Sequence, residues 1–142
     1  MKKRPLVLLL NDEPGVLDLL EFFFEEAGFQ SLRATKDQEA LALLREHSIY
    51  LLVQDVLRPD GDGRAFYETL KKDKKLRKIP VLFTTASSME SLDSVSESMR
   101  VFGDGYIELP FDIQDFLAVV KKILVHHKKV QASDFNLGLS KV

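Results

Sequence analysis

The sequence has 142 residues, of which 45% are hydrophobic and 30% are charged, and its formal net charge at pH 7 is -2. This length suits one domain with a substantial core, and the composition is that of a globular protein rather than a disordered one. Basic and acidic residues are interspersed, so no charge pattern favours direct binding of nucleic acid or of an anionic membrane. The chain has no cysteine, which excludes disulfides, thiolate metal ligands and a cysteine nucleophile.

The first residues combine a basic segment with a short apolar run. That run covers only Leu6 to Leu10 before polar residues end it, which is too short for a secretion signal. No other stretch approaches the length of a membrane span. We therefore expect a cytoplasmic protein without membrane contact.

Hydrophobic periodicity predicts strands and helices in alternation. Apolar runs predict strands at residues 5–10, 29–34, 49–53, 79–84 and 106–108. Apolar residues at helical spacing predict five helices: Pro14 opens the first and Gly28 stops it, and the third begins near Ala65. Capping residues are expected to open the others: Thr35 with Gln38, Ser87 with Glu90, and Asp112 with Asp115.

Five strands alternating with five helices predict an α/β fold with a doubly wound parallel sheet. Right-handed crossovers favour the flavodoxin-like (βα)5 arrangement with strand order 2-1-3-4-5. In this order the first and third strands are neighbours, so Asp12 and Asp55 are expected to lie side by side. We expect residues 1–125 to form this domain, with residues 126–142 as a tail or the start of a linker.

Polar side chains follow three of the predicted strands: Asn11, Asp12 and Glu13 after the first, Asp55 after the third, and Thr84 and Thr85 at the end of the fourth. Carboxylates held close together repel one another unless a cation lies between them, and Mg²⁺ suits a site with few protein oxygens. Asp55 could then act as a nucleophile, because carboxylates form aspartyl phosphates. By spacing alone, the alternative that these residues only cap helices and solvate loops carries equal weight.

Four motifs occur together and in order: NDEP, QDVLRPDGDG, PVLFTTAS and GYIELPF. With them, residues 5 to 125 resemble a response-regulator receiver domain, the CheY-like phospho-acceptor module of two-component signalling. The resemblance implies that Asp55 accepts the phosphoryl group. It also implies a Mg²⁺ site of Asp12, Asp55, the backbone carbonyl of Leu57 and, more weakly, Asn11, with Thr85 and Tyr106 as the residues of the conformational switch.

Two positions depart from the family pattern. Asn11 stands where the family has an acidic residue, which removes one negative charge and should weaken metal binding. Leu109 stands where the family has a lysine that contacts the phosphoryl oxygens, and leucine cannot do so. Arg58 could supply the missing positive charge, although an exposed loop arginine is its simpler interpretation.

The resemblance implies a regulatory domain rather than an ordinary enzyme, although such a domain can catalyse its own phosphotransfer. Its expected partners are a histidine kinase or phosphotransfer protein, a downstream protein or fused output domain, and a second copy in a homodimer. The signal would pass through the surface of the fourth helix, fifth strand and fifth helix. Asn11 and Leu109 motivate the alternative of a pseudo-receiver that binds partners without phosphorylation. A flavin carrier would share the fold, but the loop NDEPG is acidic where a flavin phosphate needs free amides.

Overall fold

The computed structural model describes residues 4–58, 61–85, 104–108 and 110–127. Its strands are β1 (Leu6–Leu10), β2 (Gln30–Ala34), β3 (Leu51–Asp55), β4 (Leu57–Arg58), β5 (Gly61–Asp62), β6 (Val81–Thr85) and β7 (Gly105–Glu108). Its helices are α1 (Pro14–Glu26), α2 (Asp37–Glu46), α3 (Gly63–Lys72) and α5 (Ile113–His126). The helix predicted from Ser87 and Glu90 lies outside the described residues.

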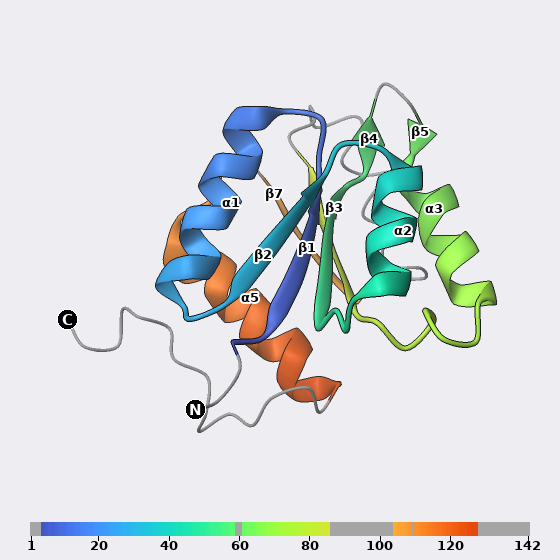
Figure 1. Ribbon diagram of the computed structural model, residues 1–142. Helices are drawn as coiled ribbons and strands as arrows, with labels where there is room; N and C mark the ends of the chain where they lie inside the picture. Colours follow the sequence, from blue (N-terminus) through green and yellow to red (C-terminus); the bar gives the residue numbers. More distant parts are fainter. Residues whose placement is uncertain (1–3, 59–60, 86–103, 109, 128–142) are drawn as a thin grey trace.

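The main sheet has five parallel strands in the order β2-β1-β3-β6-β7 (Figure 1). This is the predicted doubly wound order, because β6 and β7 are the fourth and fifth strands of that sheet. The short antiparallel pair of β4 and β5 was not predicted, since Pro59, Gly61 and Gly63 indicated only an irregular loop. No helix among the described residues combines the length and apolar character needed to cross a membrane.

Two hydrophobic clusters hold the helices against opposite faces of the sheet, as Figure 1 shows. The first lies between the sheet and helices α1 and α5, and the second between the sheet and helices α2 and α3. Alternate residues of each central strand enter opposite clusters because side chains alternate across a strand. In β1, for example, Val7 and Leu9 belong to the first cluster, and Leu8 and Leu10 to the second.

The residues predicted to begin and end α1, and to begin α5, are confirmed. Pro14 is the first residue of α1, and Gly28 follows the helix with φ of +89°, a conformation that glycine adopts without strain. The Asp112 carboxylate accepts a hydrogen bond from the Asp115 backbone N–H at 2.8 Å. Local sequence therefore determines these helix boundaries.

The predicted pairing of Thr35 with Gln38 is wrong. Thr35 instead bonds the Glu39 carboxylate, through its backbone N–H at 3.1 Å and its hydroxyl at 2.9 Å. The reason is that α2 begins at Asp37, so the third residue of the helix, whose side chain can reach back, is Glu39. These hydrogen bonds lower the pKa of Glu39.

The third strand begins and ends two residues later than the prediction of 49–53. Pairing with both neighbouring strands decides this, because the register places Leu51 opposite Val7 of β1 and Asp55 opposite Thr84 of β6. Asp55 is consequently the last residue of β3 rather than a residue of the following loop. Its backbone is therefore held in the sheet.

Candidate functional site

Asp55 lies at the carboxyl edge of the sheet, where the strand order changes direction. It ends β3, the central strand, and its side chain is half-buried. On one side it is in register with Thr84 of β6. On the other side Leu10 pairs with Gln54, so Asn11, one residue further, follows β1 next to Asp55. In parallel α/β sheets this crevice is where ligands bind.

The acidic segment after β1 is held by Asn11. This residue is 3% exposed, its backbone N–H donates to the Ala34 carbonyl at 3.1 Å, and its side-chain Oδ1 accepts from the Glu13 N–H at 2.9 Å. Asp12 lies between these anchored positions and is exposed at the start of α1. The strand ends that carry Asp12 and Asp55 are thus neighbours, while the amide oxygen of Asn11 is already used within the loop.

The backbone on the other side of Asp55 is fixed by Gly63, the first residue of α3. Its N–H donates to the Val56 carbonyl at 2.8 Å. A Cβ atom built at position 63 would lie 2.6 Å from the Asp55 carbonyl oxygen and 3.2 Å from the Val56 Cα. Only glycine allows this close approach, so Gly63 sets the path of the chain that leaves Asp55.

Thr84 and Gln54 are neighbours of Asp55, and their complete burial is not predicted by the sequence pattern. Both side chains are 0% exposed, and neither the Thr84 hydroxyl nor either end of the Gln54 amide has a hydrogen-bond partner among the described residues. The available signal was a polar residue interrupting an apolar strand, in LLVQD and in VLFTT. Buried groups of this kind are rare in folded proteins and call for an explanation.

The remaining residues predicted for the site lie on β6 and β7 and on the short strand β4. Thr85 ends β6 and pairs with Glu108, and Tyr106 pairs with Phe83 and is 38% exposed on β7. Leu57 and Arg58 form β4, directly after Asp55 and Val56. Leu109 lies outside the described residues.

The oxygen atoms offered by these residues are the ligands that Mg²⁺ prefers. They comprise the carboxylates of Asp12 and Asp55 and the backbone carbonyl of Leu57, with the Asn11 amide as a neutral fourth. No group of three or more histidine, cysteine or acidic residues suited to a metal occurs in the described part of the chain. These oxygens are of the kind that suits Mg²⁺, which takes few protein ligands and keeps several waters, and the two carboxylates give the set little negative charge.

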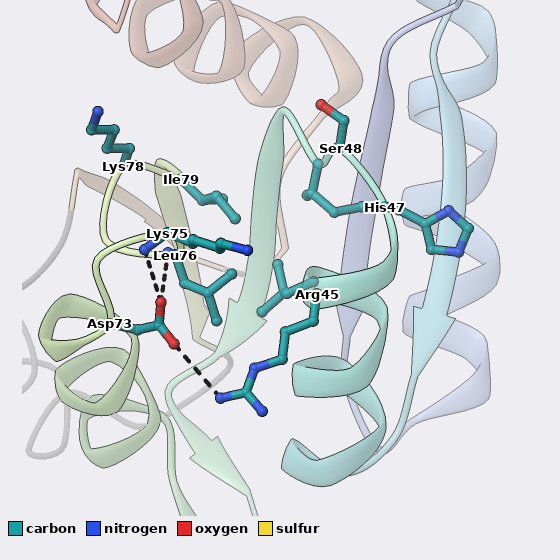
Figure 2. A pocket seen from close by; sticks show the side chains of 10 residues that line it. Arg45, His47, Ser48, Asp73, Lys75, Leu76, Lys78 and Ile79 are labelled. Atoms are coloured by element: carbon teal, nitrogen blue, oxygen red, sulfur yellow. Dashed lines mark hydrogen bonds and ion pairs between the residues drawn. The ribbon is translucent and has the colours of Figure 1, made fainter.

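A cavity of about 580 Å³ lies at the opposite edge of the sheet, between the end of α2 and the loop after α3 (Figure 2). On its wall the Asp73 carboxylate accepts from the backbone N–H groups of Lys75 at 2.8 Å and Leu76 at 3.2 Å, and pairs with Arg45 at 3.6 Å (Figure 2). These backbone hydrogen bonds, and then Arg45, lower the pKa of Asp73. This cavity is a gap between elements and is remote from Asp55. The Asp73 carboxylate on its wall already has hydrogen-bond and ion-pair partners.

Comparison with known proteins agrees with the geometry. The family model of the response regulator receiver domain matches residues 7–121. The chain is 31% identical over 123 residues to the response regulator Rre1 of Synechocystis sp., which covers 86% of this chain and 52% of that protein. It is also 31% identical over 119 residues to the polar-differentiation response regulator DivK of Brucella ovis, covering 83% of this chain and 94% of that protein.

A solved structure supports the same assignment. The receiver domain of a signal transduction histidine kinase from Syntrophus aciditrophicus is 29% identical, covers 90% of this chain and 96% of its own, and superposes with a TM-score of 0.77. The chain spans about half the length of several curated relatives, with 52%, 49% and 48% of the relative covered in three cases. The family match and the shared fold show that this chain belongs to the response regulator receiver domains of two-component signalling.

Proposed function

We propose that Asp55 is the phospho-acceptor of this receiver domain. The observation that carries the proposal is the place of Asp55, at the end of the central strand and between the strand ends that hold Asn11 and Thr84. Gly63 supports it, because the close contact with the Asp55 backbone holds that residue in one position. A nucleophile held in a fixed orientation loses less entropy when it reacts.

In the proposed reaction a carboxylate oxygen of Asp55 attacks the phosphorus of the donor. A bond from that oxygen to phosphorus forms, the bond from phosphorus to the leaving oxygen breaks, and the leaving group departs with the electron pair. Asp12, Asp55 and the Leu57 carbonyl would hold Mg²⁺, with Asn11 contributing weakly. A metal ion bound there neutralises charge that develops on the phosphoryl oxygens.

The proposed switch couples Asp55 to the surface of β7 and α5. The phosphoryl group adds negative charge and acceptor oxygens, toward which Thr85, at the end of β6, would move. Tyr106 lies one strand further out, is 38% exposed, and would turn inward behind it. The surface that includes β7 and α5 would then change shape for a partner.

We also propose that residues 1–125 are the receiver unit and that residues 126–142 are a tail or lead to a further segment. The upstream partner would be a histidine kinase or phosphotransfer protein. The downstream partner would be a separate protein or an output domain in the same chain. Relatives about twice the length of the match support the second arrangement.

A pseudo-receiver is the second candidate, and Asn11 is the observation that favours it. Its Oδ1 already accepts the Glu13 N–H, so the residue that replaces an acidic metal ligand serves the loop instead. With Leu109 in place of a lysine, the site would have fewer groups to bind a phosphoryl group. In this case partner binding should be unaffected by Asp55→Ala.

Incubation with acetyl phosphate and Mg²⁺, followed by intact mass spectrometry, tests the first candidate. The expected result is a gain of one phosphoryl group by the wild-type chain and no gain by Asp55→Asn. Asp73→Asn, at the opposite edge of the sheet, is the matched control and should gain the group normally. No gain in the wild type, or a gain that survives Asp55→Asn, would rule out phosphorylation at Asp55.

A further inference from the structure

In the part of the chain that the structure describes, the buried side-chain atoms without a hydrogen-bond partner are gathered around Asp55. Among the described residues, three buried side-chain atoms have no hydrogen-bond partner: both ends of the Gln54 amide and the Thr84 hydroxyl. Gln54 precedes Asp55 in β3, and Thr84 is in register with Asp55 on β6. Each such group costs folding free energy, and natural proteins tend to retain this cost where function requires it.

The two residues face opposite sides of the sheet. Gln54 lies between Leu52 and Val56 in the alternation of β3, on the side covered by α2 and α3. Thr84 lies two residues after Leu82, on the side covered by α1 and α5. Residues in register on parallel strands point to the same face, so Thr84 shares the face of Asp55 and Gln54 does not.

The Thr84 side chain therefore lies on the same side of the sheet as that of Asp55, on the neighbouring strand. Neighbouring strands lie about 4.8 Å apart, so rotation about χ1 is enough to carry a threonine hydroxyl toward the side chain beside it. The Thr84 backbone is held in the sheet, since its carbonyl accepts the Val56 N–H at 3.0 Å, and the whole residue is buried. The hydroxyl is the part of this residue that has no hydrogen-bond partner within the described ranges.

We propose that Thr84 is a positioning residue whose hydroxyl is held in reserve for the phosphorylated form of Asp55. This inference rests on the proposed function. When the phosphoryl group is transferred, the Thr84 O–H donates a hydrogen bond to the modified side chain and keeps its proton. A hydrogen bond to a charged acceptor is about twice as strong as one between neutral groups. With Leu109 in place of a cation, an additional donor beside Asp55 offsets part of the lost attraction.

Thr84→Val and Thr84→Ser separate this role from simple packing. Valine keeps the shape of threonine and removes the hydroxyl, whereas serine keeps the hydroxyl. Thr69→Val is the matched control, because Thr69 is exposed on α3 and its hydroxyl donates to the Ala65 carbonyl of the same helix at 3.1 Å. Each protein is treated with acetyl phosphate and Mg²⁺, and the phosphorylated fraction and its decay are followed by intact mass spectrometry. In a separate experiment, the unmodified form of each protein is unfolded in urea.

The expected result has two parts. First, Thr84→Val raises the urea midpoint of the unmodified protein, because a buried hydroxyl without a partner among the described residues is removed. Second, Thr84→Val lowers the ratio of phosphorylated to free protein about tenfold, which is the effect of losing one hydrogen bond to a charged group. Thr84→Ser and Thr69→Val keep that ratio near the wild-type value. A packing role would change the midpoint and leave the ratio alone.

Three results would overturn the proposal: an unchanged ratio in Thr84→Val, a lower urea midpoint in that variant, or Thr84→Ser behaving like Thr84→Val. These three results can be distinguished from a result that refutes phosphorylation of Asp55 itself. If the wild type gains no phosphoryl group, phosphorylation itself is refuted and the Thr84 role falls with it. If the wild type gains the group and Thr84→Val gains it equally, only the role of Thr84 is refuted.

Discussion

Gly63 lies directly against the backbone of Asp55. A Cβ atom at position 63 would lie 2.6 Å from the Asp55 carbonyl oxygen, well inside contact distance, and that oxygen belongs to a strand end that is fixed in the sheet. The start of α3 and the end of β3 at Asp55 thus determine each other's positions. The contact explains why a glycine opens this helix.

Gly63→Ala should destabilise the protein by about 1–3 kcal/mol, the usual cost of forcing an extra carbon into a packed site. It should also slow phosphorylation, because the strand end that carries Asp55 must shift. Urea unfolding and the acetyl phosphate assay measure the two effects.

Gly15→Ala is the control for that substitution. Gly15 is in α1, and a Cβ atom there would have nothing within 4 Å. Alanine should stabilise the helix by about 0.5–1 kcal/mol without changing phosphorylation. Equal effects of the two substitutions would contradict the steric argument.

Asn11→Asp should tighten Mg²⁺ binding about tenfold, because a carboxylate adds charge to the proposed site, whose other charged groups are Asp12 and Asp55. Aspartate can still accept the Glu13 N–H, so the loop should keep its conformation. Calorimetric titration with Mg²⁺ measures the change. Gln30→Glu adds the same charge at the exposed start of β2 and should leave the affinity unchanged. An affinity that is equal in Asn11→Asp and the wild type would place the metal elsewhere.

Gln54→Met should stabilise the protein by about 1–3 kcal/mol, because it keeps the volume similar and removes a buried amide that has no hydrogen-bond partner in the described part of the chain. The side chain lies between Leu10 and Phe83 in the register, so methionine meets apolar neighbours. Urea unfolding measures the gain. Gln38→Met, at an exposed position of α2, should change stability by little. A loss of stability in Gln54→Met would show that the amide is paired.

Stability should fall at high pH through Tyr67. Burial, and then the charge of Asp104, raises the pKa of Tyr67 to about 12. The phenol of an unfolded chain ionises near pH 10, so the folded state favours the protonated form. The contribution of Tyr67 is complete below about pH 10 and is lost as the pH rises toward about 12.

Tyr67→Phe isolates this effect. Burial lowers the pKa of Lys71, which lies over the Tyr67 ring at 4.9 Å, and that titration acts with the opposite sign. Because Lys71 is present in both proteins, the difference between wild type and Tyr67→Phe reports Tyr67. Urea unfolding between about pH 9 and about pH 12 should show the stability of the wild type falling more than that of Tyr67→Phe. Parallel curves would contradict the assignment.

Local sequence was sufficient wherever neighbouring residues decide the structure. Pro14, Gly28 and Asp112 mark helix ends through their own backbone or side-chain chemistry, and each acts as predicted. The alternation of apolar runs also determined the order of the main sheet, because few topologies satisfy right-handed crossovers. The motif residues identified the family without coordinates.

Tertiary structure decided what depends on contacts between distant segments. Pairing with β6 extended β3 to Asp55, whose register partner is Thr84. The sequence alone named Asp55 and placed it at a strand end, but not the closeness of Gly63 or the unpaired hydroxyl of Thr84. Distances and hydrogen-bond partners across strands are set by packing of the whole domain, and no local pattern of residues encodes them.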